Sequence, residues 1–161
     1  YKRACHDGCT HIPLVIAGPG FDAGRVADQL VSLMDLPITL TAAAGADCAG
    51  MAGNPLQLIA QGLGAQLPSH VFIQISESQV GRAVRTARYK YSVRAHGLDG
   101  NAAPGSPVYR EDCLYDLADD PFERTNLVSH PGYAEVRAQL ARLLIRDMVQ
   151  AGEQAPEILP L

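Results

Sequence analysis

The C-terminal part of the chain contains a helical pattern that requires a partner surface. Between residues 133 and 148, apolar side chains recur at helical spacing and form one stripe: Tyr133, Val136, Leu140, Leu143, Leu144 and Met148. The other side of this helix is polar and carries Glu135, Arg137, Gln139, Arg142 and Arg146. A helix that is apolar on one side must bury that side against another element. The chain must therefore supply a surface on which this helix lies.

Three β-prone runs before the helix supply that surface. They cover residues 71–76, 82–86 and 88–93. Apolar and polar residues alternate in the first and last runs, and only a short joint separates the last two. Both features favour an antiparallel meander. A loop rich in glycine and proline follows, and a brief fourth strand is predicted at 113–117. Residues 67–161 are thus predicted to form a small four-stranded antiparallel sheet packed on a C-terminal helix.

The first part of the chain has the texture of an α/β domain. The apolar run 12–18 is typical of a buried strand, and 29–33 is a second candidate. Asp35 offers an N-cap for a helix that ends at Gly45, and a shorter helix follows from residue 54.

Residues 1–66 are therefore predicted to be the tail of a mixed α/β sheet domain. Two strands are too few to close a parallel sheet, so we expect further chain before Tyr1.

Charge and hydropathy exclude several classes of partner. The chain has 13 Lys and Arg against 17 Asp and Glu, a net charge of -4, which provides no footprint for nucleic acid or an anionic membrane. Apolar runs are too short to span a bilayer, and a signal-peptide pattern is absent. We expect a soluble protein, with the cytoplasm as the favoured compartment, and a homo-oligomer stays open. The basic residues of the meander are assigned to a solvated outer sheet face opposite the helix: Arg82, Arg85, Arg88 and Lys90.

A cluster of potential metal ligands lies near the start of the chain. It consists of Cys5, His6, Cys9 and His11. Structural zinc sites usually pair two ligand knuckles at defined spacing, and this sequence contains no second cluster. Reduced thiols are the preferred interpretation; a Cys5–Cys9 disulfide and a small metal-binding protein stay as alternatives.

Three motifs follow one another in a fixed order. The first comprises Lys2, His6-Asp7, His11, Pro13 and Pro19-Gly20. The second comprises Val31-Ser32-Leu33, Asp35-Leu36, Thr39-Leu40 and Ala44-Gly45. The third runs from Arg82 to Tyr91 and continues as Leu114-Tyr115-Asp116-Leu117, Asp120-Pro121, Glu123 and Asn126-Leu127. In these motifs the chain resembles the C-terminal portion of the formylglycine-dependent sulfatases, which belong to the alkaline phosphatase superfamily.

The resemblance implies an alkaline phosphatase-like α/β fold and the hydrolysis of small-molecule sulfate esters. Such enzymes use a hydrated formylglycine nucleophile and a bound Ca²⁺. Lys2 is implied to be a catalytic residue that binds the substrate sulfate, because an ammonium group suits an oxyanion. His6 is a second catalytic candidate, with a structural imidazole as the alternative, and His11 is taken as structural. Asp7 and His11 stand where the family usually has Glu and Arg, which predicts a weakened ion pair at this point.

The residues that would carry the reaction are not in this chain. None of the four cysteines begins the nucleophile motif Cys-x-Pro/Ala-x-Arg, and the family's calcium ligands precede the position of Lys2. No metal ligand is therefore assigned here. We expect a C-terminal sulfatase fragment that is inactive alone. A phosphate or phosphonate monoester hydrolase of the same superfamily and a non-catalytic truncated module are the alternatives.

Overall fold

The computed structural model describes residues 4–21 and 24–161. Contacts divide the chain into two compact units. One contains residues 13–71, and the other combines the N-terminal segment up to Ile12 with residues 72–161. The predicted domain boundary at residues 66 and 67 stays a prediction.

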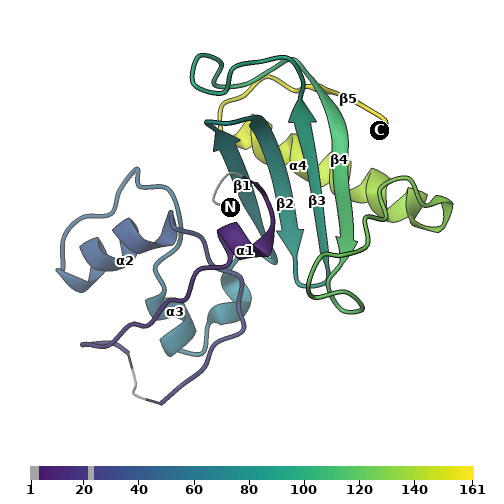
Figure 1. The fold of residues 1–161 in the computed structure, drawn as a ribbon. Helices are drawn as coiled ribbons and strands as arrows, with labels where there is room; N and C mark the ends of the chain where they lie inside the picture. The colour runs from purple at the N-terminus through teal and green to yellow at the C-terminus, as the bar shows by residue number, and fades with distance from the viewer. Residues whose placement is uncertain (1–3, 22–23) are drawn as a thin grey trace. The chain divides into compact units, whose positions relative to one another are not determined.

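The larger unit is built on a five-stranded sheet in the order β1-β2-β3-β4-β5 (Figure 1). Its strands are β1 (His70–Ser76), β2 (Val80–Thr86), β3 (Tyr89–Ala95), β4 (Val108–Asp116) and β5 (Glu157–Leu159). Strands β2, β3 and β4 pair antiparallel, and β5 pairs parallel to β4. The four predicted strands are present. The short β5 was not predicted, because three residues carry too little periodicity to reveal a strand.

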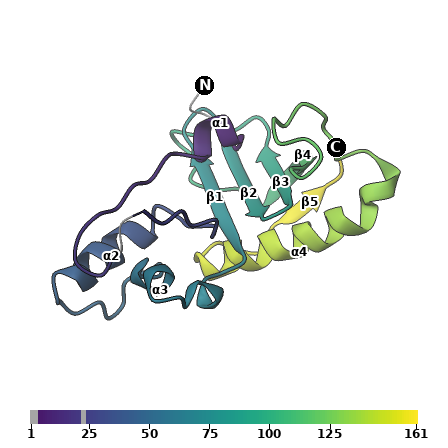
Figure 2. The same cartoon turned by 90° about the horizontal axis from the view of Figure 1, so that it is seen from below.

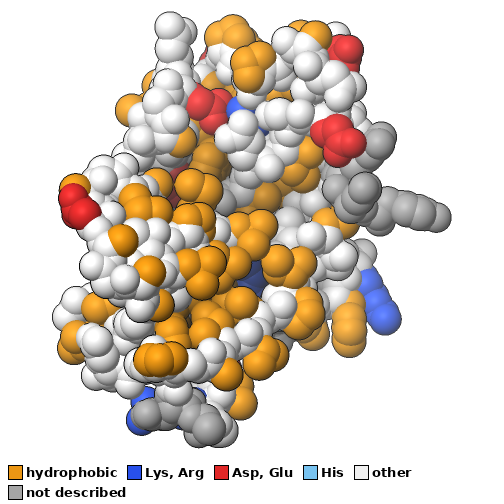
Figure 3. Space-filling model, turned by 90° about the vertical axis from the view of Figure 1, so that its left-hand side faces the viewer, with side chains coloured by type: hydrophobic (Ala, Val, Ile, Leu, Met, Phe, Trp, Pro, Cys, Tyr) orange, Lys and Arg blue, Asp and Glu red, His pale blue; other side chains and the backbone are white. Residues whose placement is uncertain are grey.

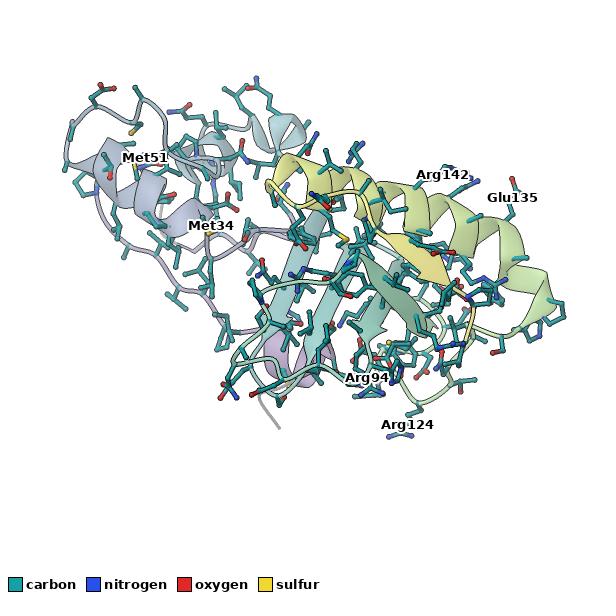
Figure 4. All side chains as sticks on the ribbon, turned by 90° about the horizontal axis from the view of Figure 1, so that it is seen from above. Met34, Met51, Arg94, Arg124, Glu135 and Arg142 are labelled. Atoms are coloured by element: carbon teal, nitrogen blue, oxygen red, sulfur yellow. The ribbon has the colours of Figure 1, made fainter. Side chains whose placement is uncertain are left out.

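Helix α4 (Ala134–Gln150) covers one face of this sheet, while α1 (Asp7–Thr10) lies on the other (Figure 2). The helix-covered face contains the main core: Val80, Val84, Tyr91, Val93, Leu114, Leu140, Leu144 and Met148, among others. Glu135 and Arg142 project from α4 away from the sheet (Figure 4). The predicted amphipathic helix is confirmed.

Within residues 4–21 and 24–161, no helix combines the length and the apolar character needed to cross a membrane.

Strand register decides which side chains face α4. Val84 pairs with Tyr91, and Tyr91 pairs with Leu114, so these three share the helix-covered face. Lys90 adjoins Tyr91 and pairs with Tyr115 of β4. Because successive residues of a strand point to opposite faces, Lys90 and Tyr115 lie on the second face.

Two basic residues that were assigned to a solvated face opposite the helix are buried. For Arg82 the predicted face is wrong, whereas Lys90 lies on the predicted face and only its predicted solvation is wrong. Arg82 is 1% exposed and Lys90 is 0% exposed. Arg82 lies on the α4 side, where its Nε donates to Glu153 Oε1 at 2.7 Å and its Nη2 donates to the Pro104 carbonyl at 2.6 Å. For Arg82 the error has a simple cause: Arg82 and Arg85 are three residues apart in one strand and must point to opposite faces.

The smaller unit contains α2 (Asp35–Ala43), α3 (Gln57–Ala60) and the 3-10 turn η1 (Gly64–Gln66). Both predicted helices are present. Asp35 is the first residue of α2 and not its N-cap; its carboxylate accepts from the backbone N–H groups of Ser32 and Asn54 at 2.6 and 2.7 Å. Gly53 has a φ of 95°, and a Cβ there would collide with the Met34 carbonyl. This close approach ties the loop before α3 to the start of α2.

The predicted strands at 12–18 and 29–33 are wrong for this structure. The described residues of 13–69 contain only an isolated bridge between Gly18 and Phe21. Strand backbones need a paired neighbour, and the described residues of 13–69 provide none. Several apolar side chains of the unit are consequently exposed: Leu14, Val15, Val26, Leu33, Met34, Leu40 and Leu63. Figure 3 shows hydrophobic side chains gathered on the face that it presents.

The core of the larger unit predicts a large difference between two positions of α4. Leu144→Ala removes a fully buried side chain, so we expect a loss of about 2–5 kcal/mol in the free energy of unfolding. Val149→Ala, in the same helix at 49% exposure, should cost less than about 1 kcal/mol. Urea unfolding of both variants measures the contrast. Equal losses would contradict the packing of α4 on this sheet.

Candidate functional site

A buried ionic cluster connects the N-terminal segment to the second face of the sheet. The Lys90 side chain is 0% exposed, and its ammonium donates to the Asp7 carboxylate. The same ammonium lies 2.5 Å from Glu123 Oε1, as an ion pair without an aligned hydrogen bond. Asp7 belongs to α1, and Glu123 belongs to the turn that follows β4. Three distant segments of the sequence therefore meet at one positive charge.

The turn around Glu123 is fixed by Asp120. The Asp120 carboxylate accepts from the backbone N–H groups of Arg124 and Thr125 at 2.6 and 2.7 Å, and such bonds are how aspartate commonly fixes a turn. Glu123 has a φ of 55°, a left-handed conformation that costs a non-glycine residue about 1 kcal/mol. Such strain persists only where surrounding contacts impose it. The turn therefore holds Glu123 so that its carboxylate points to Lys90.

Glu123 also contacts the two residues of the His6-Asp7 pair. Its Oε2 accepts from the Asp7 backbone N–H at 2.8 Å and lies 3.3 Å from His6 Nδ1. The His6 ring centroid lies 5.6 Å from that of Tyr115. The His6 side chain stays 47% exposed, whereas that of Glu123 is 5% exposed. Glu123 and Tyr115 thus set the place of an imidazole that is still open to a ligand.

The sequence predicts an ion pair between Asp7 and His11, but the closest cations to Asp7 are those of Lys90 and Arg85. Its distance to His11 Nδ1 is 3.9 Å, and the His11 side chain is 76% exposed, so that pair is weak. Arg85 approaches Asp7 Oδ2 to 3.5 Å in addition to the contact from Lys90. Burial opposes ionisation of Asp7, but the Lys90 hydrogen bond and the charges of Lys90 and Arg85 outweigh it and lower the pKa of Asp7. The predicted weakening applies to the His11 pair alone.

Two thiols are buried near the ionic cluster, one in the N-terminal segment and one in β4. Cys5 and Cys113 are both 6% exposed, and Cys113 Sγ lies 2.8 Å from Ser92 Oγ. Burial and the nearby Cys113 and Asp112 raise the pKa of Cys5 to about 12, and burial raises the pKa of Cys113 to about 11. Cys5 and Cys113 therefore stay protonated at neutral pH and pack as small apolar side chains. In the described part of the chain, no three His, Cys, Asp or Glu side chains form a group that could hold a metal ion.

The structure describes only one of the two catalytic candidates. Lys2 lies outside the described residues, so its role as a catalytic and substrate-binding residue stays a prediction. His6 is placed beside Glu123, as described above. Lys90 and Glu123 are the residues that sequence reasoning missed. Both belong to the third motif. A lysine between two tyrosines of a β-prone run could have indicated a buried cation, and Glu123 is an acidic residue of the same motif that could pair with it.

Comparison with known proteins decides the family. Residues 1–150 match the family model of the N-sulphoglucosamine sulphohydrolase C-terminal domain. The chain belongs to this sulfatase family. The match includes the His6-Asp7 pair, Lys90 and Glu123, so the ionic cluster lies entirely within the sulfatase homology.

Individual relatives are sulfatases as well. The chain is 34% identical to a Δ4,5-hexuronate-2-O-sulfatase of Bacteroides thetaiotaomicron over 86% of its length and 28% of the relative. It is 27% identical to an ulvan-active sulfatase of Formosa agariphila over 88% of its length and 34% of the relative. The solved structure of a 2-O GAG sulfatase superposes with a TM-score of 0.64 at 31% identity, covering 84% of this chain and 29% of that one. The alkaline phosphatase-like fold is confirmed.

The acids nearest His6 do not fit the calcium site of a sulfatase. Asp7 and Glu123 share the Lys90 ammonium, and Asp7 also faces Arg85. A calcium ion needs several free oxygen ligands, whereas these carboxylates already face positive charge. The ionic cluster is therefore an arrangement that holds a segment in place.

The lowered pKa of Asp7 predicts a pH-dependent contribution to stability. A depressed folded pKa stabilises the protein above the ordinary value of 3.8, and this contribution disappears as pH falls through the folded value. Asp7→Asn should lower the free energy of unfolding by about 2 kcal/mol at pH 7, and the deficit should shrink below pH 3.8. Urea unfolding between pH 3 and pH 7 measures this, with the exposed Asp28→Asn as control. A deficit that does not change with pH contradicts the pairing.

The thiols predict two classes of reactivity. Cys9 and Cys48 are partly exposed, whereas Cys5 and Cys113 are buried with raised pKa values. At pH 8 a thiol reagent such as DTNB should modify two thiols quickly and the other two only after unfolding, because the thiolate is the reacting form. Peptide mapping identifies them. Rapid modification of Cys5 would show that the N-terminal segment is not seated on the sheet.

Proposed function

We propose that this chain forms the C-terminal part of an enzyme that hydrolyses sulfate esters. The family match over residues 1–150 carries the proposal. It is supported by the first motif, whose His6 is held by Glu123 and stays accessible at the surface. In this proposal Lys2 binds a non-bridging sulfate oxygen, and His6 borders the pocket that holds the ester. A fixed positive charge is effective there because charge gathers on the sulfate oxygens in the transition state.

We propose a sulfated saccharide as the substrate class. A curated relative and a solved structure, each above 30% identity, support this choice: the relative is named for a hexuronate-2-O-sulfate, and the structure is that of a 2-O GAG sulfatase. The uronate carboxylate of such a saccharide would need cations and hydrogen-bond donors from elsewhere in the enzyme, because the carboxylates of the ionic cluster already occupy Lys90 and Arg85.

The formylglycine nucleophile and the calcium ligands belong, in this proposal, to protein outside these 161 residues. The isolated chain then has a sulfate-binding lysine and an imidazole but no nucleophile. It should release no sulfate from an aryl sulfate, because the residual groups bind the ester without attacking it. A colorimetric assay with p-nitrophenyl sulfate measures this, and a robust rate from the purified chain contradicts the assignment of the nucleophile.

The gene provides the complementary test. An open reading frame upstream of the codon for Tyr1 that encodes Cys-x-Pro/Ala-x-Arg supports the proposal, and a stop codon immediately before Tyr1 contradicts it.

The enzyme encoded by that frame should release sulfate from a 2-O-sulfated unsaturated uronate disaccharide. Lys2→Ala should lower kcat/KM about 100-fold, because one fixed charge on the reacting oxyanion is lost. Arg142→Ala, which changes an exposed side chain of α4, should leave kcat/KM unaltered. Ion chromatography of released sulfate gives the rates. An undiminished rate in the Lys2→Ala enzyme would remove Lys2 from the site.

A further inference from the structure

We propose that Glu123 and Lys90 are positioning residues that hold the His6-Asp7 segment in the orientation required for substrate. This inference rests on the proposed function, in which His6 borders the sulfate pocket. Lys90 is fully buried and Glu123 nearly so, hence neither can touch a substrate. They act through the segment that they contact.

The segment cannot fix its own position. Helix α1 has only four residues, far fewer than an isolated helix needs to be stable in water. His6 at its N-cap makes no side-chain capping bond among the described residues. The place of the segment must therefore come from tertiary contacts, which are the burial of Cys5 and the contacts of His6 and Asp7 with the ionic cluster.

A carboxylate is needed at position 123 because its two oxygens have different tasks. Oε1 faces the Lys90 ammonium, while Oε2 accepts the Asp7 N–H and lies against His6 Nδ1. A glutamine can present only one acceptor oxygen, and its amide group would bring a donor toward either Lys90 or His6. It would also leave the buried ammonium with Asp7 as its only counter-charge in the cluster. The negative charge of Glu123 and its two acceptor oxygens together set the orientation of the segment.

The rest of the third motif holds Glu123 in place. The Arg88 guanidinium makes a bidentate pair with Asp116, with Nη2 2.7 Å from Oδ2, at the end of β4. On the far side of the turn, Asn126 Oδ1 accepts from the Leu114 N–H at 3.0 Å, and its Nδ2 donates to the Asp112 carbonyl at 2.9 Å. The start of the turn is thus fixed to the joint between β2 and β3, and its far end is fixed to β4. The motif between Arg82 and Leu127 serves the His6-Asp7 pair at the opposite end of the sequence.

Hydrogen exchange of the full 161-residue chain tests the inference. In Glu123→Gln, the amides of residues 4–11 should exchange at least tenfold faster, while those of β2 and β3 stay unchanged. Glu153→Gln is the matched control, because it neutralises the partner of the buried Arg82 and does not touch the segment. Its residues 4–11 should exchange as in the parent chain.

Lys90→Met provides the reciprocal variant and should loosen the same residues. A second readout is the ¹⁵N resonance of His6 Nδ1, which should move in Glu123→Gln while the resonances of His70, His96 and His130 stay in place. If the 4–11 amides and the His6 resonance are unchanged in Glu123→Gln, the inference is wrong. It is equally wrong if all amides of the sheet accelerate together in Glu123→Gln, since that reports a general loss of stability. Should Lys90→Met unfold, Glu123→Gln decides alone.

Activity separates this inference from the proposed function. In the complete enzyme, Glu123→Gln should lower kcat about tenfold, and Glu153→Gln should leave kcat unchanged. If the complete parent enzyme releases no sulfate while Glu123→Gln shows the expected exchange pattern, the proposed function is wrong and the positioning role stands. Normal sulfate release by Glu123→Gln, with loosened 4–11 amides, refutes the catalytic relevance of the positioning and leaves the function intact.

Discussion

The buried ammonium of Lys90 is the constraint on which the arrangement of the larger unit depends. Removing such a charge from water costs several kcal/mol, and only close counter-charges offset that cost. Asp7 and Glu123 supply them from opposite directions in the sequence. The protein therefore cannot bury Lys90 without bringing together the middle of the sheet, the turn after β4 and the N-terminal segment.

The two faces of the sheet perform different physical tasks. The face under α4 is a continuous apolar core whose burial supplies the main driving force for folding. The other face has a small apolar group of Cys113, Tyr115 and Leu117 together with the ionic cluster. Hydrophobic contacts have little directional preference, whereas ion pairs and hydrogen bonds fix distance and angle. The second face is thus suited to place the His6-Asp7 segment with precision.

Patterns that repeat could be predicted from the sequence. The stripe of α4 and the alternation of the meander are periodic, so they identify the helix, the sheet and the face that is buried between them. The run 12–18 has the composition of a buried strand, but the described residues of 13–69 supply no strand to pair with it. Composition can favour a strand, but only a neighbouring strand can satisfy its backbone. The third motif pointed to the sulfatase family while the task of Glu123 in it stayed hidden.

The sequence by itself determined the family, the helix on its sheet and the candidacy of His6, because these depend on local pattern and on motifs read in order. Only the tertiary structure decided that Lys90 is buried, that Arg82 faces α4, and that Glu123 holds the His6-Asp7 pair. Those facts depend on strand register and on contacts between residues separated by 83 and 116 positions. The interaction that brings such residues together exists only once the chain has folded, so no local window of the sequence contains it.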